Sequence, residues 1–144
     1  MIRHLISVIR YLTVVIFTVT VVVFASPEID QLIETAKNRY GDRGHQIVSQ
    51  WNTMLLDAAS HTEEEQLHQV NNFFNQRIAF SSDQRIWGRS DYWATPLETM
   101  GLMQGDCEDF SIAKYISLLK LNVPLAKLRL TYVKADVGLA KPQA

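Results

Sequence analysis

The only cysteine of the chain, Cys107, stands among three acidic residues, and this cluster holds the residue types best suited to chemistry. The stretch reads Gly105-Asp106-Cys107-Glu108-Asp109-Phe110 and opens a segment with a helical pattern. The first turn of a helix offers unpaired backbone N–H groups and the positive end of the helix dipole. Both favour the thiolate, which is the nucleophilic form of cysteine. A lone cysteine is otherwise usually an inert packing residue, so Cys107 is a candidate nucleophile with packing as the alternative.

The carboxylates beside Cys107 complicate this prediction, because negative charge near the sulfur disfavours a thiolate. Asp106, Glu108 and Asp109 either cap the helix, where acids in the first turn are common, or bind a cation that neutralises them. Carboxylate oxygens with loop carbonyls suit Ca²⁺, although the cluster lacks the spacing of an EF-hand loop. We therefore predict Asp106, Glu108 and Asp109 as candidate calcium ligands. Zinc is not expected, because its sites need several Cys or His ligands.

A cysteine protease also needs a general base, normally a histidine that an Asp or Asn orients. The histidines of this sequence, all of which precede Cys107, are His4, His45, His61 and His68. No pattern places any of them at the thiol, and we interpret those at 61 and 68 as solvated residues. The sequence thus supplies a candidate nucleophile without an evident base.

Helical patterns dominate the chain, and a single clear strand follows them. Helices are predicted at about 26–40, 43–59, from a cap at 62, from 95–96 to about 101–105, and at 107–121. Residues 77–80 are a strand or a helix end, and residues 81–92 form a loop. Trp87 and Trp93 either pack that loop down or line a groove. Alternating residues from Leu128 predict a half-buried strand, so the predicted class is α/β (α+β), helix-rich at first, with a sheet incomplete at the C-terminus.

Composition and charge describe an ordinary domain behind a targeting segment. The chain has 144 residues, 47% hydrophobic, with a net charge of −1, which is not the balance of a nucleic-acid-binding protein. Residues 1–25 are predicted to be a signal peptide, or an N-terminal anchor, with basic residues before an apolar run and Ala25 at the cleavage position. The domain would then occupy 26–144 and lie in the periplasm.

An ordered set of motifs strongly resembles the bacterial transglutaminase-like cysteine peptidases, and within them the LapG-type periplasmic proteases. The motifs are Asn71-Asn72-Phe73-Phe74-Asn75, Trp87-Gly88, Asp91-Tyr92-Trp93-Ala94-Thr95-Pro96-Leu97-Glu98, Gly105-Asp106-Cys107-Glu108-Asp109, Ala113-Lys114-Tyr115 and Leu128-Arg129-Leu130-Thr131-Tyr132-Val133. Together they cover about residues 28–144.

The resemblance implies a papain- or transglutaminase-like core with a Cys-His-Asp triad in which Cys107 is the nucleophile. It implies calcium held by Asp106, Glu108 and Asp109. It also implies an enzyme that clips large surface adhesins in the periplasm and releases cells from a biofilm, controlled by an inner-membrane receptor for cyclic-di-GMP. Family members carry the His and Asp further along, so we expect this 144-residue chain to be truncated before the catalytic His and nearly inactive.

Two other functions remain open from the sequence. A chain without a full triad could be a non-catalytic periplasmic binding module that docks a partner through the loop between Trp87 and Trp93. A protein-glutamine transferase of the same fold would use the same triad, so its sequence would look alike.

Overall fold

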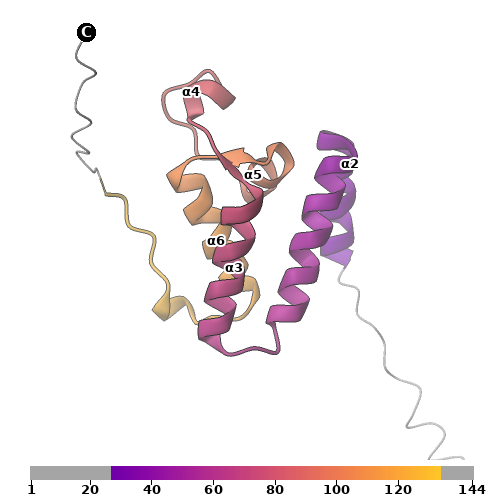
Figure 1. The fold of residues 1–144 in the computed structure, drawn as a ribbon, viewed down its shortest axis with the longest axis vertical. Coiled ribbons are helices and arrows are strands. Elements are labelled where there is room, and N and C mark those ends of the chain that lie inside the picture. The colour runs from indigo at the N-terminus through magenta and orange to yellow at the C-terminus, as the bar shows by residue number, and fades with distance from the viewer. Residues whose placement is uncertain (1–26, 134–144) are drawn as a thin grey trace, which may run out of the picture. The chain divides into compact units, whose positions relative to one another are not determined.

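The computed structural model describes residues 27–133. The elements, drawn in Figure 1, are α2 (Pro27–Ala58), α3 (Glu63–Arg77), β1 (Ala79–Phe80), α4 (Asp83–Ile86), α5 (Pro96–Leu102), β2 (Gln104–Gly105), α6 (Cys107–Lys120) and the 3₁₀ turn η1 (Leu125–Lys127). The chain divides into two compact units after Asp30, and the second unit begins at Gln31. The predicted signal segment 1–25 lies outside the described residues. No helix within 27–133 has the length and apolar character needed to cross a membrane.

The helix boundaries follow local signals in the sequence. Gly41 has φ 68° and ψ −158° inside α2, so the predicted break between two helices is confirmed as a kink within one element. Thr62 and Thr95 each cap the following helix through a reciprocal capping box, with Glu65 and Glu98 as the partners. The predicted starts of α3 and α5 are therefore confirmed.

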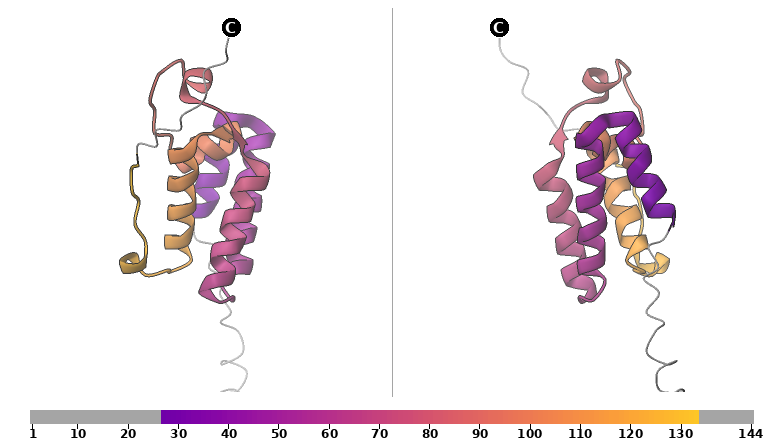
Figure 2. Two further views of the ribbon diagram at one scale, coloured as in Figure 1. Left: turned by 60° about the vertical axis from the view of Figure 1, so that its left-hand side comes forward. Right: turned by 90° about the vertical axis from the view of Figure 1, so that its right-hand side faces the viewer.

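Helix α6 packs against α3 and α5 (Figure 2). Its buried positions include Ala113, Ser117 and Leu118. The indole Nε1–H of Trp51, from α2, donates to the Ser117 hydroxyl at 2.8 Å, in a buried hydrogen bond that joins residues far apart in sequence. This packing fixes the helix that begins with Cys107.

A small parallel sheet precedes α6. Ala79 pairs with Gln104 and Phe80 with Gly105, so β1 and β2 hold the entry to α6 against the end of α3. Within residues 27–133 these are the only paired strands, and the prediction of an α/β core with an incomplete sheet is confirmed.

Two predicted segments differ from the structure. The half-buried strand predicted from Leu128 is wrong, because residues 128–133 are unpaired and Leu130 and Tyr132 are 50% and 76% exposed. The cause is that no strand among the described residues lies beside this segment to accept its backbone hydrogen bonds. The predicted loop 81–92 contains the short helix α4, whose start at Asp83 follows the extended residue Ser82.

Candidate active site

Cys107 is the first residue of α6, and its side chain is exposed. The predicted position at a helix start is therefore confirmed, and the exposure argues against a purely packing role. The 14 residues of α6 direct the unpaired N–H groups of its first turn toward this end of the helix. A thiolate or a developing negative charge here would be stabilised by those groups and by the helix dipole.

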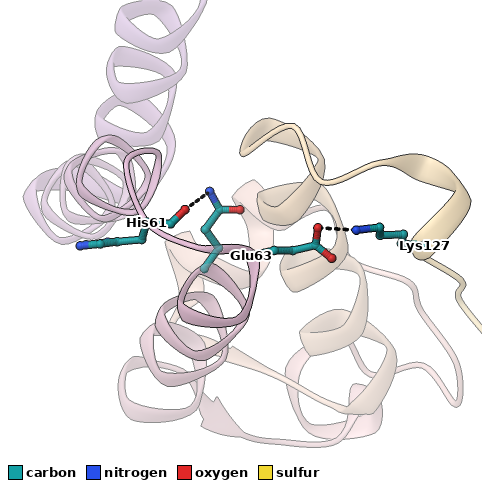
Figure 3. A network of polar contacts seen from close by, with 4 residues as sticks. His61, Glu63 and Lys127 are labelled. Atoms are coloured by element: carbon teal, nitrogen blue, oxygen red, sulfur yellow. Dashed lines mark hydrogen bonds and ion pairs between the residues drawn. The ribbon is translucent and has the colours of Figure 1, made fainter.

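A groove of about 780 Å³ lies beside the thiol. One wall is α6, which contributes Cys107 and Glu108, and the opposite wall is the unpaired segment 128–133, with Trp93 also in the lining. Just before this second wall, Lys127 forms an ion pair of 2.7 Å with Glu63, the first residue of α3. Figure 3 shows this ion pair, with His61 nearby. The groove is thus open to solvent and has the nucleophile candidate in its lining.

Asp109 is buried under the first turn of α6 and serves as a structural acceptor. Its Oδ1 accepts the Ala94 N–H at 2.8 Å, and its Oδ2 accepts the Asp106 N–H at 3.3 Å. A Cβ on Gly105 would come within 2.9 Å of this side chain, so the approach requires glycine. Burial raises the pKa of Asp109, although its two backbone hydrogen bonds lower it. The capping alternative therefore describes Asp109 well.

Asp83 joins the predicted acidic residues, although no sequence motif pointed to it. Its side chain is 3% exposed, and its Oδ2 accepts the Tyr92 N–H at 2.6 Å. Ligand oxygens of Asp83, Asp106 and Asp109 lie within 4.8 Å of one another, as do those of Asp83, Asp91 and Glu108. Asp83 is the first residue of the short helix α4, so its acidic type was the only sequence signal.

Two oxygens of this cluster lack partners. Oδ1 of Asp83 and Oδ1 of Asp106 are both buried without a hydrogen bond. Burial, together with the nearby Glu108 carboxylate and the charges of Asp83 and Asp109, raises the pKa of Asp106 to about 7. Buried carboxylate oxygens that converge without donors are costly unless a cation or a proton joins them. The donor set is oxygen only, which fits a hard divalent cation.

Comparison with known proteins decides the family. Residues 40–140 match the family described as bacterial transglutaminase-like cysteine proteinase. The chain belongs to this family.

Solved structures of a family member agree with that assignment. Legionella pneumophila LapG matches with a TM-score of 0.55 and 34% identity, over 67% of this chain and 52% of LapG. The EGTA-treated form of the same LapG matches with the same score and identity, over 67% of this chain and 50% of that one. The chain therefore spans about half the length of the LapG chains it matches. No curated protein matches it. The LapG-type resemblance drawn from the sequence is confirmed.

The described histidines of this chain lie away from the groove. His45 lines a separate groove between α2 and α3, and His61 Nδ1 is 2.9 Å from Gln69 Nε2. His68 lines a small apolar pocket next to Leu67. Among residues 27–133, therefore, no histidine lines the groove with Cys107.

Each of the two predicted roles, packing the loop down and lining a groove, is filled by one tryptophan. The ring of Trp87 packs on Tyr92, with centroids 4.4 Å apart, and so anchors the loop. Trp93 is 55% exposed and lies in the groove lining. The loop therefore both packs down and contributes to the groove.

Proposed function

We propose that this chain carries the nucleophile and the cation site of a periplasmic, calcium-dependent cysteine endopeptidase. The observation that supports the proposal most directly is the exposed Cys107 thiol at the start of α6, in the lining of a groove and beside an acidic cluster with unpartnered oxygens. The family membership of the chain makes peptide-bond hydrolysis the first chemistry to test.

The residues of this chain would act as follows. The Cys107 sulfur attacks the carbonyl carbon of a peptide bond lying in the groove, and the N–H groups of the first turn of α6 receive the negative charge that develops on the oxygen. The attack needs a base and the leaving amine needs a proton. We assign both tasks to the histidine and aspartate that the family resemblance implies further along the protein, since no histidine follows Cys107 in this sequence.

The acidic cluster would hold calcium through Asp83, Asp106, Glu108 and Asp109. The two buried oxygens without partners, on Asp83 and Asp106, support this assignment more directly than the charge count does. Bound calcium supplies positive charge that offsets the carboxylates around Cys107 and so favours its thiolate. Asp109 would keep its hydrogen bonds to Ala94 and Asp106 and hold the first turn of α6 in place.

The substrate and the setting follow from the resemblance. We propose that the substrate is a large surface adhesin, that cleavage releases cells from a biofilm, and that an inner-membrane receptor for cyclic-di-GMP controls access to it.

The test uses the complete peptidase, which includes the histidine and aspartate that the resemblance implies, together with calcium and the N-terminal region of a large adhesin. Cleavage followed by gel electrophoresis and mass spectrometry should require calcium, stop in excess EGTA and disappear in Cys107→Ala. Cleavage by Cys107→Ala at the wild-type rate would overturn the nucleophile assignment. Amide links between glutamine and an added amine, in place of hydrolysis products, would show a transferase instead.

A binding module is the second candidate, because Trp93 is a large exposed aromatic on the groove. Such a module would capture a periplasmic receptor domain without cleaving anything. Trp93→Ala should then abolish capture, whereas Trp87→Ala would act only through loss of the packing on Tyr92. Capture without any hydrolysis in the presence of calcium would favour this candidate over the peptidase.

A further inference from the structure

Lys114 lines the groove that contains Cys107 and also the small pocket beside Leu67 and His68. Its ammonium donates to Oδ1 of Asn71 and to Oδ1 of Asn75, both at 2.7 Å, and both partners lie on α3. The same nitrogen lies 5.5 Å from the centre of the Phe110 ring. These contacts fix the position of the charge with respect to α6 and α3.

Neutral groups alone hold this charge. Within residues 27–133 the ion pair is that between Lys127 and Glu63, so no carboxylate oxygen lies within 4.0 Å of the Lys114 ammonium. Of the three donors that an ammonium carries, two are used by the asparagines. Burial lowers the pKa of Lys114, since the groove replaces part of its hydration, and a nearby anion would compensate for that loss.

The place of Lys114 relative to Cys107 suits an extended ligand. Both residues line the groove, and their positions, seven apart on one helix, fall on the same face. The rise of an α-helix separates their backbone positions by about 10 Å along the axis. That distance corresponds to about three residues of an extended chain. Arg129, on the opposite wall, adds a second cation, whereas Glu108 is next to the thiol.

We propose that Lys114 is a specificity-determining residue that selects a polypeptide with an acidic side chain about three residues from the bond presented to Cys107. The inference rests on the proposed function in that it takes the groove as the place where a polypeptide lies. An acidic side chain would accept a hydrogen bond from the third N–H of the ammonium and would also attract its positive charge. An amide of equal size would accept the hydrogen bond without that attraction between opposite charges. Lys114 thus contributes to substrate selection and takes no part in the bond cleavage.

A thiol-exchange measurement tests this without any need for hydrolysis. Acetyl-Cys-Ala-Ala-Asp-Ala-amide and its Asn counterpart, and the two sequences reversed, are equilibrated with the protein in a β-mercaptoethanol redox buffer. The mixed disulfide with the exposed Cys107 is measured by intact mass spectrometry. In one of the two sequence directions, the Asp peptide should form about fivefold more mixed disulfide than its Asn counterpart. This Asp-to-Asn ratio should fall as salt is added.

Three variants separate charge recognition from structure. Lys114→Met should bring the Asp-to-Asn ratio to one, and Lys114→Arg should keep it, because it retains the charge. Lys120→Met is the matched control, since Lys120 is exposed at the end of α6 and outside the groove lining, and its ratio should equal that of the wild type.

Equal capture of the Asp and Asn peptides by the wild type, no capture of either, or an unchanged ratio in Lys114→Met would overturn the inference. A preserved ratio together with absent adhesin cleavage would count against the proposed hydrolysis alone. A ratio of one together with calcium-dependent cleavage would count against the Lys114 inference alone.

Discussion

Asp83 is the residue on which the cation site depends most strongly. It is buried, one of its oxygens lacks a partner, and it belongs to both groups of converging carboxylates. Asp83→Asn should keep an acceptor for the Tyr92 N–H while removing a negative ligand. We expect calcium affinity, measured by isothermal titration calorimetry, to fall by at least about tenfold.

The control for that experiment is Asp42→Asn, because Asp42 is an exposed acid on α2 outside both groups. It should bind calcium like the wild type. Wild-type affinity in Asp83→Asn would remove Asp83 from the site.

Asp106 gives a pH dependence with a definite sign in protein without calcium. Its pKa is raised from 3.8 to about 7, so the folded state keeps a proton there that the unfolded state has already lost. The contribution to stability is present below about pH 4 and is lost as the pH rises to about 7. Asp106→Asn has no carboxyl to titrate at this position and so does not lose this stability. In EGTA the difference in Tm, variant minus wild type, should therefore increase from pH 4 to pH 7 and stay constant above pH 7.

The measurement is thermal unfolding at a series of pH values, with the difference in Tm between the two proteins as the readout. The difference cancels the contributions of other carboxyls, such as that of Glu65, whose pKa is lowered mainly by its hydrogen bonds to Thr62. A difference that stays constant across this range would contradict the assignment of the raised pKa to Asp106.

At the scale of the elements, the hydrogen bond between Trp51 and Ser117 fastens α6 to α2. Ser117→Ala would leave the indole N–H of Trp51 buried without an acceptor, since the bond is fully enclosed. The free energy of unfolding, from urea titration, should fall by about 1–3 kcal/mol. Ser60→Ala, at an exposed hydroxyl that donates to the Asp57 carbonyl, should change it by less than about 0.5 kcal/mol. An equal effect of the two substitutions would contradict the account of how α6 is held.

Local signals made the helices predictable. The capping boxes of Thr62 and Thr95 predict the starts of α3 and α5, and Gly41 predicts the kink in α2. The helical pattern after Gly105 placed Cys107 at the start of α6. These features depend on residues a few positions apart, so the sequence contains them in full.

At the scale of the whole molecule, the features that depend on distant residues escaped prediction. Asp83 reaches the acidic cluster because its loop folds back onto the start of α6, which no local pattern encodes. The groove exists because segment 128–133 lies opposite α6 without pairing, although its alternating residues predicted a half-buried strand. The sequence indicated Lys114 only as part of a family motif. Its contacts could not be predicted, because its asparagine partners are about forty positions away, on α3.

The central claim is that the acidic cluster and Cys107 form one functional unit whose thiol responds to calcium. The most direct test is the rate at which iodoacetamide alkylates Cys107 at pH 7, in EGTA and in excess calcium, followed by intact mass spectrometry. Neutralising the carboxylates should raise the thiolate fraction, so we predict an alkylation rate about tenfold higher with calcium. Asp106→Asn should already react faster than the wild type in EGTA and respond less to calcium. An alkylation rate that calcium leaves unchanged in the wild type would contradict the claim.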